Sequence, residues 1–115
     1  MLHAGKLSLQ RTIKYALYVD LAIERSICPA AIRSDVTLAG EAINWIVSRP
    51  EVHARAVPLV AAYLNNSTYI GRLGYGAFPV RARAQALLRG IAERSPVLSR
   101  EIQARLASAP PTVCF

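Results

Sequence analysis

Residues 48–63 read SRPEVHARAVPLVAAY, and this stretch holds the clearest helix signal in the chain. Ser48 and Glu51 have the spacing of a capping box, in which the serine accepts from an early amide and the glutamate reaches back. Pro58 falls on the polar face, where a proline bends a helix without entering the core. The stretch predicts an amphipathic helix over residues 50–64, with its apolar stripe at Val52, Ala56, Leu59, Val60 and Tyr63.

The same 3.6-residue periodicity predicts four more helices, over about residues 7–27, 37–47, 79–94 and 96–107. Between residues 65 and 78 the periodicity stops, which predicts a loop; a short hairpin through residues 68–70 and 72–73 stays open. A chain of 115 residues has the length of one domain. We therefore expect an all-α fold: a single domain over residues 1–115, built as a compact bundle of about five helices arranged as helix hairpins.

The periodicity also predicts which side chains face the core. In the first helix the apolar stripe contains Asp20, and a buried carboxylate needs a cationic partner or an interface. In the second helix the stripe includes Trp45. The residues expected in these two stripes are Leu9, Ile13, Ala16, Ile23 and Ile27, followed by Leu38, Ala42, Trp45 and Ile46.

Two helix pairs in the sequence have matching positions. Their turns lie at Pro50 and Pro96, an offset of 46 residues, which is within the period of HEAT and armadillo repeats. The stretch Arg49-Pro50-Glu51-Val52-His53-Ala54-Arg55-Ala56-Val57 resembles the start of the second helix of a HEAT repeat, and the likeness covers about half the chain. It implies stacked helix hairpins. A compact bundle that reuses such hairpins is the alternative.

Charge is the strongest signal for function. The chain carries 14 basic and 7 acidic residues, net +7, and residues 71–115 alone account for net +5. Twelve of the bases are arginine, the side chain best suited to bidentate contact with phosphate or carboxylate; a GC-rich genome is the competing explanation. A basic field of this kind favours an anionic partner.

The candidate binding residues are C-terminal arginines and nearby aromatics. Arginines on one side of the last two helices could bind phosphate, or could be a solvated face. Aromatic residues in the loop could stack on single-stranded nucleic acid or fold back on the core. The residues are Arg72, Arg81, Arg83, Arg89, Arg94, Arg100, Arg105, Tyr69, Tyr75 and Phe78.

The sequence displays no catalytic, metal or cofactor motif. The acids are scattered, His53 lies beside an apolar stripe, and the two cysteines have no metal-ligand spacing. No apolar run approaches the roughly 18–20 residues of a membrane span. We expect a protein that is not an enzyme and has no cofactor: a protein–protein interaction module, adaptor or accessory subunit of a larger assembly. The alternative is an RNA- or single-strand-binding protein.

The expected location is intracellular. Two distant cysteines favour a reduced, cytoplasmic setting. The first nineteen residues contain three bases and no acid, which also resembles a mitochondrial targeting segment, so an organellar location stays open.

Overall fold

The computed structural model describes residues 6–21, 37–72 and 75–112, and in these ranges the chain forms an all-α bundle with one small β-hairpin. The elements in chain order are α1 (Lys6–Tyr18), α3 (Leu38–Val47), the 3-10 helix η1 (Pro50–Val52), α4 (His53–Ala61), β1 (Ile70–Arg72), β2 (Tyr75–Ala77), α5 (Pro79–Arg94) and α6 (Pro96–Ala107). The expected fold class is confirmed.

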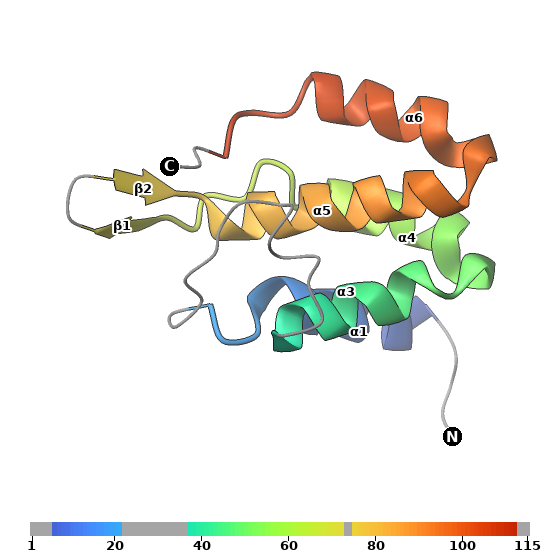
Figure 1. Ribbon diagram of the computed structural model, residues 1–115, viewed down its shortest axis with the longest axis horizontal. Coiled ribbons are helices and arrows are strands. Elements are labelled where there is room, and N and C mark those ends of the chain that lie inside the picture. The colour runs from blue at the N-terminus through green and yellow to red at the C-terminus, as the bar shows by residue number, and fades with distance from the viewer. Residues whose placement is uncertain (1–5, 22–36, 73–74, 113–115) are drawn as a thin grey trace.

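Helix α5 is the centre of the bundle. It packs against α1, α3, α4 and α6, and Figure 1 shows α6 on one side of it and the α1–α3 layer on the other. The stripe predicted for this helix is fully buried, as expected for a helix covered on several sides. Its members are Val80, Ala84, Leu87, Leu88 and Ile91.

The first helix is shorter than its periodicity predicts. It ends at Tyr18, and residues 19–21 form a turn in which Asp20 has φ of 50°. A left-handed residue ends a right-handed helix, and aspartate tolerates this conformation better than most residues. Asp20 is exposed there, so the expected buried ion pair was wrong. Leu9, Ile13 and Ala16 are buried as predicted, whereas Ile23 and Ile27 lie outside the described residues.

The predicted capping box does not form. The Ser48 hydroxyl donates back to the Trp45 carbonyl at 2.9 Å, at the C-terminal end of α3. The chain then makes the 3-10 turn η1, whose N-cap residue Arg49 provides no side-chain cap, before α4 begins at His53. Pro58 is exposed within α4, as predicted, and the helix ends at Ala61, three residues before the expected boundary.

Helix α3 is rotated relative to the prediction. Its buried residues are Ala39, Gly40, Ile43 and Ile46, while Leu38 and Trp45 are each 46% exposed. Two overlapping apolar stripes exist in this helix. Packing between α1 and α5 selects the one with the β-branched isoleucines, and the expectation that Trp45 faces the core was wrong.

Segment 65–78 contains a β-hairpin, which the sequence analysis gave as the alternative to a loop. Strands β1 and β2 pair antiparallel, with Ile70 opposite Ala77, Gly71 opposite Gly76 and Arg72 opposite Tyr75. The first strand begins two residues later, and the second three residues later, than the alternative placed them. The hairpin projects from one end of the bundle, beside the start of α5 (Figure 1).

Gly90 allows α5 and α3 to approach closely. A Cβ atom at this position would lie 2.7 Å from Cγ2 of Val47. Replacing Gly90 with Ala should therefore cost about 1–3 kcal/mol of overpacking, against a helix-propensity gain of about 1 kcal/mol. We expect a net loss of about 1 kcal/mol in the free energy of unfolding, measured by urea denaturation.

A double-mutant cycle provides the control for Gly90. In the Val47→Ala background the obstructing methyl is absent, so Gly90→Ala should become neutral or stabilising. If Gly90→Ala had the same effect in both backgrounds, the two helices would not be in contact at this point.

Candidate interaction surface

The predicted arginine surface divides into three groups in the structure. Arg83 is completely buried, Arg81 and Arg105 are half-buried and engaged with the protein itself, and Arg89, Arg94 and Arg100 are exposed. The side chain of Arg72 lies outside what the structure describes. The seven arginines therefore do not form one continuous outer face.

Arg83 belongs to the core, which corrects its assignment to a binding surface. Its Nη1 donates to the carbonyl of Val19 at 2.7 Å and to that of Ala16 at 3.5 Å, at the C-terminal end of α1. Carbonyls at a helix end lack intrahelical partners and carry partial negative charge, so a guanidinium there is favourable. The sequence could not show this, because the two segments are 64 residues apart.

Arg81 connects three separate segments. Its Nε donates to the Asn66 carbonyl at 2.8 Å, its Nη1 donates to the Pro111 carbonyl at 3.2 Å, and its guanidinium carbon lies 3.8 Å from the centre of the Phe78 ring. These contacts occupy two guanidinium nitrogens and one face of the Arg81 guanidinium with groups of the protein itself. Arg81 is therefore a structural residue at the C-terminal segment rather than part of an open basic face.

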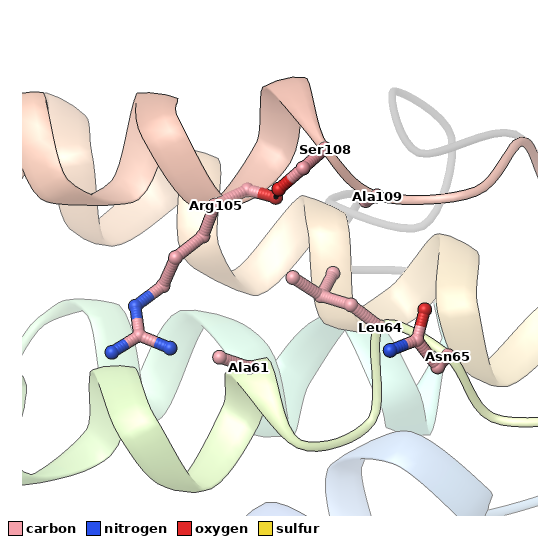
Figure 2. Close-up of a pocket in the computed structure, with 6 residues that line it drawn as sticks. All are labelled: Ala61, Leu64, Asn65, Arg105, Ser108 and Ala109. Atoms are coloured by element: carbon pink, nitrogen blue, oxygen red, sulfur yellow. Dashed lines mark hydrogen bonds between the residues drawn. The ribbon is translucent and has the colours of Figure 1, made fainter.

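Arg105 is neutralised by its own helix. Its guanidinium lies 3.1 Å from the Glu101 carboxylate, one turn earlier on α6. It also lines a small pocket of about 170 Å³ between α6 and the end of α4, together with Ala61, Leu64, Asn65, Ser108 and Ala109. Figure 2 shows Arg105 extending from α6 toward Ala61. Because Glu101 already neutralises Arg105, the residues that line this pocket provide no free positive charge for an anion.

Arg89, Arg94 and Arg100 keep the character that the sequence predicted. All three are exposed, and none of them forms an ion pair with a carboxylate in residues 6–21, 37–72 and 75–112. Arg89 and Arg94 lie on α5, and Arg100 lies on α6. They are the part of the predicted surface that remains available to a partner.

The aromatic residues of the hairpin region are partly used internally. Tyr69 and Phe78 make an edge-to-face contact with ring centres 5.2 Å apart, and Arg81 covers Phe78. Tyr69 is still 58% exposed. The side chain of Tyr75 lies outside the described residues. Of these rings, the two that the structure describes, Tyr69 and Phe78, therefore offer at most a small stacking surface.

A second exposed surface lies on the outer face of α3, and sequence reasoning missed it. Leu38, Glu41, Trp45 and Arg49 follow one another at helical spacing, and all are exposed. The Arg49 guanidinium carbon lies 4.1 Å from the centre of the Trp45 ring, a cation–π contact, while Glu51 is 4.0 Å from the same arginine. The signal in the sequence was that this helix has two apolar stripes, because packing can bury only one of them and leaves the other exposed. We call these four residues the α3 face.

One histidine–serine pair is brought together from distant segments. His53 Nδ1 lies 2.6 Å from Ser95 Oγ, and Nε2 lies 2.9 Å from the Val47 carbonyl and 3.2 Å from that of Ile46. Because carbonyls only accept, Nε2 carries a proton and donates to them, and in the neutral ring Nδ1 accepts from the serine hydroxyl. Through these hydrogen bonds, His53 at the start of α4 links the end of α3 to the α5–α6 turn.

The pair has the atoms of a nucleophile and its base, but the base is enclosed, while Ser95 is partly exposed. The His53 side chain is only 1% exposed, so a substrate could not approach the imidazole. Within the described part of the chain, no three His, Cys, Asp or Glu side chains are grouped so as to hold a metal ion. The expectation that the protein is not an enzyme stays a prediction.

Comparison with protein-family models, with curated proteins and with solved structures found no match to this chain. Among the described residues, no helix is both long and apolar enough to cross a bilayer. A function must therefore be inferred from the surface chemistry of the described residues.

Proposed function

We propose that this chain is a small basic protein–protein interaction module, an adaptor or accessory subunit of a larger assembly. The observation that carries the proposal is the α3 face. A half-exposed Trp45 with a guanidinium stacked on it is an uncommon use of a large aromatic on a surface, and tryptophan and arginine dominate the binding energy of protein interfaces.

The charge of the protein favours an acidic partner. The chain carries net +7, and two of the exposed arginines lie on α5, which packs directly against α3. Arg94 follows Gly90 by one turn, on the side of α5 that touches Val47 of α3. The α3 face itself holds Glu41 as well as Arg49, and Glu51 lies 4.0 Å from Arg49, so the positive charge that would speed association with an acidic segment comes from the protein as a whole.

We further propose an intracellular location. A chain with two cysteines far apart in sequence has no disulfide framework of the kind that small secreted domains use. A basic adaptor of this size fits an assembly inside the cell, in the cytoplasm or in an organelle.

The alternative function is RNA or single-strand binding, and one observation favours it. Arg89, Arg94 and Arg100 are exposed and could contact phosphates. The burial of Arg83, the engagement of Arg81 and the pairing of Arg105 reduce this surface to fewer charges than the sequence offered.

A titration separates the two functions. A short labelled single-stranded RNA is added to the protein at about 50 and 200 mM salt and followed by fluorescence anisotropy. We expect only weak binding at low salt, and no detectable binding at the higher salt. Micromolar or tighter binding that is lost on replacing Arg89 and Arg100 with Glu would establish the alternative instead.

Replacing Trp45 with Ala should remove the protein partner. Wild type, Trp45→Ala and Tyr15→Ala serve as parallel baits, and Tyr15 is the matched control because it is an aromatic residue 51% exposed on α1. We expect wild type and Tyr15→Ala to capture a partner that Trp45→Ala does not. With the purified partner, the Kd for Trp45→Ala should be at least about 30-fold higher than for wild type, because a central aromatic of the interface is lost. If the three baits enrich the same proteins equally, the α3 face is not the docking surface.

A further inference from the structure

The last described residues of the chain, 109–112, belong to no helix or strand and are held against the start of α5. The Phe78 amide, at the end of the hairpin, donates to the Thr112 carbonyl at 3.1 Å, and Arg81 Nη1 donates to the Pro111 carbonyl at 3.2 Å. Both of these bonds go to backbone carbonyls, so they place no demand on the side chains of the segment they hold. We call residues 109–112 the tail.

The tail contacts come from groups that the rest of the protein holds in place. Arg81 Nε donates to the Asn66 carbonyl, and its guanidinium stacks on Phe78. Asn66 is fixed in turn, because its side-chain amide donates to the Tyr18 hydroxyl at 2.8 Å and its side-chain oxygen accepts from the Thr68 amide at 2.9 Å. The second arm of the guanidinium is therefore already oriented toward the tail, which lowers the entropic cost of binding there.

The tail is also suited to exchange. Ala109 packs against the hydrophobic core, but Pro111 is exposed and Pro110 and Thr112 are only partly buried, so apolar contact holds mainly the first residue of the tail. Two consecutive prolines favour an extended backbone before docking. This site lies beside the end of a strand, donates hydrogen bonds to backbone carbonyls and holds a proline-containing segment. These are features of sites that bind extended peptides.

We propose that the Phe78–Arg81 corner is a peptide-binding site for an extended, proline-containing segment of a partner protein, and that the tail occupies it as a built-in competitor. This site is separate from the α3 face and does not depend on the proposed function. The partner segment gains the same two carbonyl contacts when the tail leaves. Because the tail is attached nearby, its high effective concentration sets the threshold for that exchange.

The test keeps the full chain and weakens only the tail. Replacing Pro110 and Pro111 with Gly leaves both carbonyls in place but raises the entropy lost on docking, roughly a five- to thirtyfold weakening of the tail. The probe is the peptide of residues 108–112, acetylated and amidated, titrated into ¹⁵N-labelled protein. The Phe78 amide and Arg81 Nε signals report binding. We expect the double-glycine variant to bind the peptide at least about fivefold more tightly than wild type.

Substitutions at Arg81 show whether the site is the one described. In the double-glycine background, Arg81→Met should abolish the peptide-induced shifts, while Arg89→Met, an exposed arginine on the same helix, should leave them unchanged. If the Arg81→Met variant loses its helical circular dichroism, Arg81→Lys replaces it in the test. Arg81 uses two different nitrogens for the Asn66 and tail carbonyls, and a lysine ammonium has no such fixed fork, so binding should still weaken several-fold.

Three results would overturn the proposal. One is equal binding of the peptide by wild type and the double-glycine variant. Another is binding that survives the Arg81 substitutions. The third is a concentration-dependent dimer in light scattering that competes with the peptide, which would make the tail of a second copy the true occupant.

Discussion

Replacing Arg83 with Ala should lower the free energy of unfolding by about 3–4 kcal/mol, the largest effect of any arginine in the described part of the chain. The side chain is fully buried, and its guanidinium donates to carbonyls at the end of α1. Truncation leaves those carbonyls without their charged donor, which costs about 1.5–3 kcal/mol, and it opens a cavity along the missing side chain. Urea denaturation followed by circular dichroism measures the change.

Two further variants separate the contributions at Arg83. Arg83→Met keeps most of the packing volume and loses the hydrogen bonds, so it should recover part of the loss. Arg89→Ala removes an exposed arginine from the same helix and should change stability by no more than about 0.5 kcal/mol. If Arg83→Ala and Arg89→Ala were equally mild, Arg83 would be a surface residue, and the original assignment to the basic face would be restored.

Replacing His53 with Ala should cost about 3 kcal/mol, because one substitution unlinks three helix ends. The buried ring leaves a cavity, and the carbonyls of Ile46 and Val47 lose their donor. Ser95→Ala removes only the hydroxyl and should cost about 1 kcal/mol. Thermal and urea denaturation of both single variants provide the values.

The double variant at these two positions tests the bond itself. If the 2.6 Å contact between His53 and Ser95 is formed, the combined loss should be smaller than the sum of the single losses by about 0.5 kcal/mol or more. Strict additivity would mean that the two side chains act independently. In that case the α5–α6 turn would not be fixed to the end of α3.

Much of the fold was predictable because it rests on local periodicity. The stripe of α5 and the buried residues of α1 follow the 3.6-residue spacing, and Pro79 and Pro96 begin helices where proline is tolerated. The HEAT-like resemblance of residues 49–57 stays a prediction. Where the periodicity was ambiguous, as in α3 with two overlapping stripes, the sequence selected the wrong face for Trp45.

The candidate sites were less predictable, since they depend on which distant segments meet. Helical spacing places Arg83 beside the apolar stripe of α5 and Arg89 away from it, but nothing local shows that carbonyls of α1 hold the Arg83 guanidinium. The same holds for His53 and Ser95, which are 42 residues apart and in hydrogen-bond contact.

The all-helical class, most helix starts and the net positive charge follow from the amino-acid sequence alone, because periodicity and proline positions are local features and net charge is a matter of composition. The exposure of particular arginines, the outward orientation of Trp45 and the contact of the tail with Arg81 depend instead on how the helices pack. Burial and hydrogen bonding are set by the packing of whole helices against one another, and a single helix carries no record of what will cover it.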